Sequence, residues 1–487
     1  MKKIIVIGSG FGGMATALRL RAQGHDVTLL EKLDKPGGRA YVFEQDGYSF
    51  DAGPTVITAP WLIHELFELF GKRSEDYVRI VPVHPFYRIY FHDKSYFEYN
   101  NEPGFIEENI RKFNPADVEG YREFMKRTKP IFEKGFIELA DKPFLTFGSM
   151  VKVLPDLLRL GSHRSVYSYV SKYISDPRLR MVFTFHPLLV GGNPFHTTSI
   201  YAMIHYLEKE WGVHYAMGGT GAVIRAFAKL FEEEGGTLRL NTEVDEILVN
   251  NRRATGVRLK DGTVLPADIV VSNADVAYTY LRMIKPEHRR KYSDAKVSRM
   301  RYSMSLFVVY FGTTRQYPDI AHHDIILSHR YRELLEDIFT NKILADDFSL
   351  YLHRPTATDP SMAPEGCDAF YALVPVPHNA SGIDWDTEGP RFRDRIMDFL
   401  EKNYLPELKA HLGTIRHFTP NDFQHRLNSY LGSAFSVEPI LTQSAWFRPH
   451  NRSEDIDNLY FTGAGTHPGA GLPGVLSSAK IVEQLIA

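Results

Sequence analysis

The sequence contains little cysteine, little net charge and no long hydrophobic run. Its 487 residues include one cysteine, Cys367, which excludes an internal disulfide and argues against a thiolate metal cage. The net charge is −2, so no overall field attracts nucleic acid. The apolar start Ile4–Ile7 ends at Gly8, too early for a signal peptide, and no apolar stretch approaches the ~20 residues of a membrane-spanning helix. Any membrane contact is therefore expected to be peripheral, on the cytoplasmic side.

Side-chain patterns for bond-breaking chemistry are also missing. There is no Ser/His/Asp order, no C-x-x-C pair and no metal-ligand spacing among the 20 histidines, so we expect no metal. His186 and the pair His322-His323 are interpreted as surface or core residues. His467 and Asp51 are candidates for an acid or base only because each lies in a motif described below. For Asp51 a capping or turn role is favoured.

The first forty residues carry the strongest positive signal. An apolar strand, Ile4–Ile7, leads into Gly8, Gly10 and Gly13 in G-x-G-x-x-G spacing, and a helical pattern follows. The first glycine permits the sharp turn, the second lets the backbone approach a pyrophosphate, and the third allows close packing of helix on strand. The free N–H groups and the dipole at the helix start favour an anion. This context predicts a dinucleotide-binding turn rather than an ordinary tight turn.

Two further features favour FAD over a nicotinamide cofactor. A second strand, Val27–Leu30, ends at Glu31, where a carboxylate is expected to accept the hydroxyls of an adenosine ribose. An acid at this position disfavours a ribose 2′-phosphate. Gly37-Gly38-Arg39 then resembles the second glycine patch of the two-dinucleotide flavoproteins, which implies backbone and arginine contacts to the FAD diphosphate.

The C-terminus repeats the strand, glycine loop and helix order. Asn458–Thr462 is predicted to be a strand, Gly463–Gly474 a glycine and proline loop, and the residues from Val475 onward a helix. Such a loop makes another anion-facing helix start. Ala464 stands where many flavoproteins have Asp, so a carboxylate contact is not expected there. A plain glycine-rich cap of the last helix remains the alternative for this segment alone.

Together these motifs resemble the bacterial phytoene desaturases, a carotenoid desaturase family of FAD flavoproteins. The resemblance covers essentially the whole chain. Gly148-Ser149 is a departure, because some members have an Arg-Asp pair there, so no charge-based role is transferred to that place. The matching segments outside the two glycine motifs are Asp51–Thr58, Leu188–Pro194, Glu210–Val213, Gly432–Pro439 and Leu441–Arg452.

The resemblance implies an activity and a set of partners. The substrate would be a membrane-dissolved C40 polyene, 15-cis-phytoene, and successive double bonds would lead to lycopene, or to neurosporene or another intermediate. The flavin N5 would accept the hydride, and quinone or oxygen would reoxidise the flavin. The cofactor-binding residues that we expect are Gly8, Gly10, Phe11, Gly12, Gly13, Glu31, Lys32, Gly38, Arg39, Gly53, Pro54, Val244, Gly463, Ala464, Gly465, Gly474 and Val475.

The expected fold is α/β, with nucleotide-binding elements at the start, middle and end of the chain. Residues 1–70, 215–285 and 440–487 are predicted to form a discontinuous Rossmann-like FAD-binding domain. Residues 71–135 and 286–439 are assigned to an antiparallel-sheet substrate domain, and 136–214 to a helical, membrane-associating insertion. Within the middle part we expect strands at Thr237–Val244 and Ala254–Leu259.

The helical insertion is the expected membrane contact. Between Val151 and Arg180 it carries six basic and two acidic side chains, interleaved with leucines and tyrosines. A basic amphipathic helix can lie in an anionic interface with its tyrosines at the headgroup level. The alternative is a helix that packs on its own domain with a solvated charged face.

Three other functions remain open at this point. A related flavoprotein could desaturate, isomerise or oxidise a later carotenoid, and an amine oxidase would share the same frame. A lipid-carrying relative of the fold without catalysis is the third, and it would need no tightly held flavin. The intact Gly8, Gly10, Gly13, Glu31 and Arg39 count against that third function.

Overall fold

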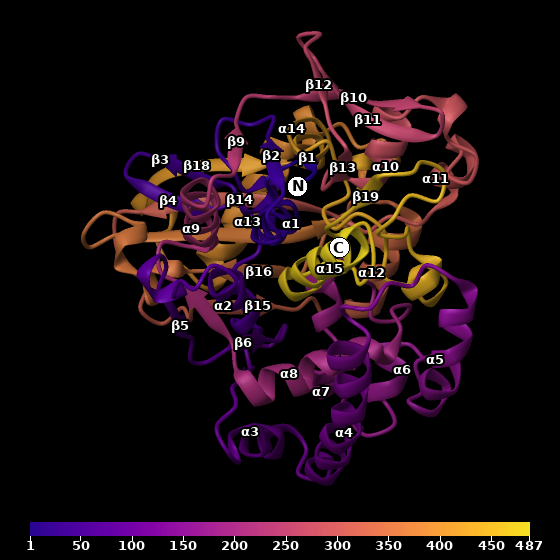
Figure 1. Ribbon diagram of the computed structural model, residues 1–487. Coiled ribbons are helices and arrows are strands. Elements are labelled where there is room, and N and C mark those ends of the chain that lie inside the picture. Colours follow the sequence, from indigo (N-terminus) through magenta and orange to yellow (C-terminus); the bar gives the residue numbers. More distant parts are fainter.

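The computed structural model describes residues 1–487 without a gap and contains a parallel sheet, a large mixed sheet and a helical region (Figure 1). The helical region forms the lower part of the molecule in Figure 1, and the two sheets with their helices form the rest. Both chain ends lie in the central part, near α1 and α15.

The five-stranded sheet has the order β19-β13-β1-β2-β9, and every neighbouring pair is parallel. Its central strands are almost wholly buried runs of Val, Ile and Leu, as expected where both faces of a parallel sheet are covered. The chain order reverses between β1 and β13, which makes their carboxyl ends a ligand-binding edge. The strands are β1 (Lys3–Ile7), β2 (Asp26–Leu30), β9 (Thr237–Arg239), β13 (Ile269–Ser272) and β19 (Leu459–Phe461).

Helices cover one face of this sheet, and a small sheet covers the other. The helices α1 (Phe11–Ala22), α9 (Thr220–Glu233) and α15 (Leu472–Ile486) pack together, with α1 between the other two. The small antiparallel sheet has the order β10-β11-β12 and shares a core with Ile5, Ile7 and Val270 of the parallel sheet. Its strands are β10 (Val244–Asn250), β11 (Arg253–Leu259) and β12 (Val264–Pro266).

The single strand expected over Thr237–Val244 is wrong. Strand β9 ends at Arg239, and the chain then crosses from the parallel sheet to the small one, where β10 begins at Val244. At the crossing, Asn241 has a positive φ of 50°, and its N–H donates to the carbonyl of Leu33. Side chains before and after the crossing pack in different cores, Leu238 with the helices and Val244 under the small sheet, so the alternating pattern does not mark where one strand ends.

The seven-stranded sheet has the order β18-β14-β17-β16-β15-β6-β7 and is antiparallel except for the β15–β6 pair. Its strand β14 alternates between two cores: Phe307, Val309 and Phe311 face the helix α13 (Trp385–Asn403), and the residues between them face the opposite side. The strands are β6 (Tyr87–Tyr90), β7 (Tyr96–Tyr99), β14 (Ser305–Thr313), β15 (His323–Ile326), β16 (Leu350–His353), β17 (Asp368–Val376) and β18 (Leu412–Phe418).

The helical region packs around an aromatic core that includes Phe124, Tyr169 and Phe183. Tyr169 is one of the tyrosines between Val151 and Arg180 that were expected at the headgroup level. It is 5% exposed and fills the interior of its own domain, so for this side chain the expectation is wrong. The helices are α3 (Phe105–Phe113), α4 (Asp117–Phe132), α5 (Phe147–Arg159), α6 (Val166–Val170), α7 (Pro177–Val182) and α8 (Met203–Trp211).

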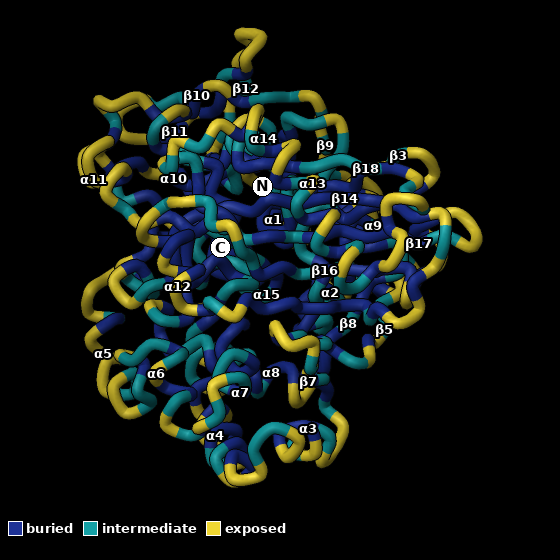
Figure 2. Tube along the Cα trace, turned by 180° about the vertical axis from the view of Figure 1, so that it is seen from behind, coloured by how far each residue is buried: buried dark blue, intermediate teal, exposed yellow.

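The remaining elements are short and connect these layers. Exposed residues gather at the tip of the β10–β12 sheet and around the rim of the molecule, whereas both large sheets are buried (Figure 2). None of the helices has the length and apolarity needed to cross a bilayer. These elements are β3 (Val42–Gln45), β4 (Tyr48–Asp51), β5 (Ile80–Pro82), β8 (His214–Ala216), α2 (Trp61–Glu68), α10 (Val276–Tyr278), α11 (Asp294–Arg299), α12 (Tyr331–Glu336) and α14 (Pro420–Arg426).

Candidate functional site

The glycine turn after β1 places a bare helix start at the edge of the parallel sheet. Gly8 has a φ of 90°, which favours glycine, and Gly10 is the N-cap of α1. No side chain caps this helix, so its first N–H groups have no protein partner at its end. The turn therefore offers backbone donors and the positive end of the helix dipole to an anion.

Asn273, which directly follows β13, packs into this turn. Its Nδ2 atom donates to the carbonyl oxygen of Gly8 over 3.3 Å. A Cβ atom on Gly12 would lie 2.7 Å from Asn273 Oδ1, and one on Gly13 would lie 1.9 Å from the oxygen of Gly8. Side chains at Gly12 and Gly13 would thus push α1 away from the sheet.

Glu31 is buried at the carboxyl end of β2 and is held by three donors. Its Oε2 accepts from the N–H and the hydroxyl of Ser9, over 2.9 and 2.7 Å, and its Oε1 accepts from the N–H of Leu33 over 2.9 Å. A carboxylate has about four acceptor positions. Glu31 therefore retains room for roughly one more hydrogen bond, which fits one hydroxyl of a ribose.

The second glycine patch brings a cation to the same cavity. Gly37 and Gly38 both have positive φ, 128° and 56°, and they lead into Arg39. Arg39 donates from Nη2 to Ser429 Oγ over 2.9 Å, while its Nε has no partner. Burial lowers the pKa of Arg39, and the nearby carboxylate of Asp275 opposes that shift. The guanidinium stays charged and keeps a free donor for a ligand.

Arg448 holds the C-terminal glycine loop. Its guanidinium is 1% exposed and donates to four backbone carbonyls, those of Val437, Gln443, Ala464 and Thr466, over 2.7–3.2 Å. The loop then leads to α15, whose N-cap Gly471 also has no side-chain cap. A second bare helix start thereby lines the same cavity as the first.

These elements surround one cavity of about 440 Å³. One end contains the glycine turn, Glu31 and Arg39. The other end lies against the seven-stranded sheet and the helical region. Over the whole cavity, 39 of the 67 lining residues are hydrophobic. The apolar end is lined by Phe185, Leu188, Leu189, Met304, Leu306, Ile325, Leu327, Tyr351, Tyr371, Leu373, Phe418 and Phe423 among others.

The structure brings most of the expected cofactor residues to this cavity. Gly13 does not line it, because Gly13 faces the β1 turn, and Gly465 does not, because it faces Val276 of α10. Both therefore serve packing. The expected residues that do line the cavity are Gly8, Gly10, Phe11, Gly12, Glu31, Lys32, Gly38, Arg39, Gly53, Pro54, Val244, Gly463, Ala464, Gly474 and Val475.

Asp51 and His467 lie behind the cavity wall. Asp51 Oδ1 accepts from the Thr220 hydroxyl and the Gly221 N–H at the start of α9, and burial raises the pKa of Asp51 to about 6. His467 Nε2 donates to the carbonyl of Leu139 over 3.1 Å, and burial lowers the pKa of His467 to about 4. Neither side chain lines the cavity, and their hydrogen bonds indicate structural roles.

Several lining residues escaped the sequence analysis. Asn273 and Asp275 follow β13, and their place beside β1 could have been inferred from a parallel sheet, in which strand ends meet at one edge. Glu208 is the one acidic lining residue at the apolar end; the other three are Glu31, Glu243 and Asp275. It is fully buried and accepts from the Tyr87 hydroxyl over 2.8 Å, with His186 Nε2 at 2.9 Å. No spacing in the sequence indicates that contact.

Comparisons with known proteins agree on one family. A family model described as flavin containing amine oxidoreductase matches residues 11–486. A phytoene desaturase (lycopene-forming) of Pseudescherichia vulneris is 53% identical over 487 residues, which is 100% of this chain and 99% of that protein. A phytoene desaturase (neurosporene-forming) of Rhodobacter capsulatus is 44% identical over 492 aligned positions, covering 100% and 94% of the two chains.

The solved structures support the fold alone. Wild-type putrescine oxidase bound to putrescine superposes with a TM-score of 0.67 at 13% identity, covering 100% of this chain and 98% of that one. The mixed α/β arrangement is therefore that of the amine oxidase type of fold.

The first prediction tests the glycine turn. Gly10→Val puts a branched side chain at the helix start, where a Cβ already lies 3.1 Å from Asn273 Nδ2, and where a diphosphate would need the same space. We expect the folded variant to purify without flavin, measured by its visible absorption. Gly148→Val is the control, because a Cβ there meets only the Thr146 hydroxyl at 3.8 Å. A yellow Gly10→Val protein with a full complement of flavin would show that this glycine turn does not bind the cofactor.

Proposed function

The chain belongs to the flavin-containing amine oxidoreductase family, and we propose that it is an FAD-dependent phytoene desaturase that forms lycopene. The main support for this proposal is the 53% identity, over the full length of the chain, to a lycopene-forming phytoene desaturase. The cavity supports the same function, because its polar end continues into an apolar end.

FAD fits the polar end of the cavity. The bare starts of α1 and α15 offer N–H groups to a diphosphate, Arg39 retains an unpaired Nε, and Glu31 retains an acceptor position. We propose that Gly10, Phe11, Gly12 and Arg39 hold the diphosphate and that Glu31 holds the adenosine ribose. When bound, FAD supplies a hydride acceptor, and the remaining work of the chain is to bind and orient the substrate.

The apolar end suits a polyene rather than an amine. The aromatic residues of this end include Phe185, Tyr351, Tyr371, Phe418 and Phe423, and such apolar walls would keep water from the reacting carbons. A polyene that loses a hydride gains positive charge, which the faces of aromatic rings attract. Hydrocarbon offers nothing to hydrogen-bond, so shape and apolar contact must position it.

The number of double bonds is the finer part of the proposal. The lycopene-forming relative is 53% identical and the neurosporene-forming relative 44%, which favours lycopene. For reoxidation we propose quinone or oxygen, since only the G-x-G-x-x-G run Gly8–Gly13 is followed by a strand with an acidic end. The other run, Gly469–Gly474, opens α15 at the same cavity and does not form a separate dinucleotide site. We assign the FAD-binding role to residues 1–70, 215–285 and 440–487, and the substrate-binding role to 71–135 and 286–439.

We further propose that residues 136–214 bind a membrane surface, through α5 above all. Phe147, Val151, Leu154 and Leu158 are 57%, 51%, 43% and 54% exposed, and their spacing places them on one stripe of α5. In both views α5 lies at the rim of the molecule (Figures 1 and 2). An exposed apolar stripe of this kind is typical of a helix that lies in a bilayer interface.

The stripe is joined to the cavity by a short stretch of chain. Phe136 and Ala140 line the cavity, whereas Phe144, a few residues later, packs against Met150 and Val153 on the inner face of α5. The proposed membrane surface therefore adjoins the cavity wall. That arrangement suits a substrate that is dissolved in lipid.

The second prediction tests the activity. A host that accumulates phytoene, given only this chain, should turn red and contain lycopene on pigment analysis. The same host given the Gly10→Val variant is the control and should stay colourless. Accumulation of neurosporene alone would correct the product, and unchanged phytoene beside a soluble, flavin-loaded protein would contradict desaturation.

The third prediction concerns proton transfer. Because neither Asp51 nor His467 lines the cavity, Asp51→Asn and His467→Ala proteins that retain FAD should desaturate within about tenfold of the unmodified chain. A positioned general base is worth about 10²–10⁴ in rate. The measurement is anaerobic single-turnover desaturation of phytoene in liposomes with an added quinone. A loss of a thousandfold or more with flavin and substrate still bound would reveal a base.

The fourth prediction concerns the membrane. Leu154→Ser with Leu158→Ser removes two half-exposed leucines from the stripe, which should weaken vesicle binding by about 2 kcal/mol, or about thirtyfold. Co-sedimentation with phosphatidylglycerol vesicles measures the affinity of each variant for the membrane. Val264→Ser with Ile343→Ser is the matched control, because those side chains are 54% and 50% exposed elsewhere.

A second variant separates charge from apolar contact. Neutralising Arg159, Arg164 and Lys172 should weaken binding by about 1 kcal/mol for each nearby basic charge, and only at low or physiological salt. Undiminished co-sedimentation of the double leucine variant would place the membrane contact elsewhere.

A further inference from the structure

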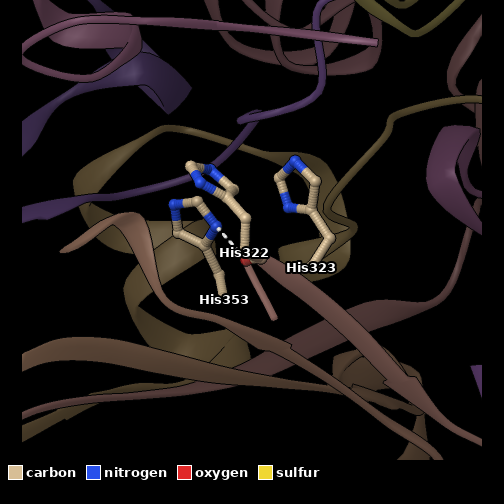
Figure 3. A group of neighbouring side chains, drawn as sticks. All are labelled: His322, His323 and His353. Carbon is tan, nitrogen blue, oxygen red and sulfur yellow. Dashed lines mark hydrogen bonds between the residues drawn. The ribbon is translucent and has the colours of Figure 1, made fainter. Parts of the chain in front are cut away.

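Three histidines meet in the interior, away from the cavity. His323 begins β15 and His353 ends β16, and the antiparallel register puts the two residues directly opposite each other. His322 precedes His323, and its ring turns toward the same space (Figure 3). The three are 3%, 0% and 0% exposed, and one ring nitrogen of each lies within 4.8 Å of the others.

In each imidazole Nδ1 has a hydrogen-bond partner and Nε2 has none. His353 Nδ1 donates to the carbonyl of His322 over 3.2 Å, so its proton is on Nδ1 and its Nε2 carries a lone pair. His322 Nδ1 lies 2.6 Å from the Thr358 hydroxyl, and His323 Nδ1 lies 2.5 Å from that of Tyr351. All three Nε2 atoms are buried without a hydrogen-bond partner.

Three unsatisfied nitrogens in one buried place call for a ligand. A buried polar atom without a partner is costly, and a structure normally satisfies it with protein, water or an ion. The hydroxyl and carbonyl partners of the three Nδ1 atoms leave each Nε2 atom free for a ligand. Neutral imidazole with its second nitrogen held by an oxygen is the form in which histidine binds metals.

We propose that His322, His323 and His353 bind one divalent transition-metal ion of the Zn²⁺ class through their Nε2 atoms. Zn–N bonds of about 2.0–2.1 Å place the nitrogens of a tetrahedral site about 3.4 Å apart. One ring nitrogen of each histidine lies within 4.8 Å of the others, so ion binding requires the rings to move closer together, and a water molecule would complete the site. This proposal departs from the expectation of no metal, because only the β15–β16 register brings His353 to the other two histidines.

The surroundings can accommodate the charge. Arg354 follows His353 in the chain, and its positive charge is balanced by Asp368, whose Oδ2 lies 3.1 Å from Arg354 Nε. Burial, and then the nearby carboxylates of Asp51 and Asp359, raise the pKa of Tyr215. The centre of the Tyr215 ring lies 4.7 Å from that of His322, so these negative charges are close to the proposed ion. The Tyr215 hydroxyl is buried without a partner and is available to a metal-bound water, which itself loses a proton readily.

The site has a structural rather than a catalytic place. None of the three histidines lines the cavity. Tyr351 stands between them and it: its hydroxyl meets His323 Nδ1 and lies 2.9 Å from the Thr55 hydroxyl, which in turn lies 2.7 Å from that of Tyr371. A bound ion would fix His323 and, through it, this row of hydroxyls in the cavity wall.

The fifth prediction is a metal analysis of the unmodified chain. Protein from cells grown with added Zn²⁺, dialysed without chelator, should contain about one Zn²⁺ per chain by mass spectrometry. Replacement by Co²⁺ should give visible d–d bands of a tetrahedral site, and added Zn²⁺ should raise the unfolding temperature of metal-stripped protein. None of these three readouts depends on activity or on FAD.

Two variants locate the ion. His353→Gln should lose the Co²⁺ bands and the Zn²⁺-dependent rise in unfolding temperature, whereas the exposed His84→Gln should keep both. Less than about a tenth of an equivalent of metal in the Zn²⁺-grown protein, with no Co²⁺ bands, overturns the proposal and leaves a water molecule as the ligand. Bands that persist in His353→Gln overturn it as well.

Discussion

The close approach of three strand ends around Asn273 governs the site. Its side chain donates to Gly8 after β1, and Cβ atoms at Gly12 and at Gly463 after β19 would lie 2.7 and 2.6 Å from its Oδ1. Only glycine fits on either side of this amide. Because the glycines let the backbones close in, the bare starts of α1 and α15 face one cavity, and backbone N–H groups supply the anion site. The chemistry of the polar end is therefore a consequence of packing density in the sheet.

The charged side chains near the cavity mostly maintain its shape. The Arg448 guanidinium donates to four carbonyls and so holds the loop from Gly463 to Gly474 in place. Asp51 accepts from the Gly221 N–H at the start of α9. Val437, Gln443 and Thr466 are buried, so leaving their carbonyls unpaired would be costly. Function then rests on where the backbone and the apolar walls hold cofactor and substrate, which agrees with a reaction whose difficult step belongs to the flavin.

The sequence predicted local features well and contacts between distant segments poorly. The Gly8–Gly13 turn, the strand ending at Glu31 and the loop from Gly463 are each encoded within about fifteen residues, and all three reach the cavity. The strand expected over Thr237–Val244 failed because a crossing between two sheets left the alternation intact. Tyr169 was misplaced because helical periodicity does not distinguish a buried stripe from a lipid-facing one. Glu208 with His186, and His353 with His322, meet only through tertiary register.

The two ends of the cavity place different demands on the fold, and the helical region reconciles them. A diphosphate needs rigid backbone donors, which the parallel sheet provides at its edge. A long hydrocarbon needs an entrance that does not face water, and no sheet edge can provide one, because unpaired strand groups bind water or other strands. Helices satisfy their backbones internally and can present apolar side chains outward. The segment from Phe136 to Phe144 runs from the cavity wall to α5, whose outer stripe is apolar. These features are the physical grounds on which the membrane contact of the insertion is proposed.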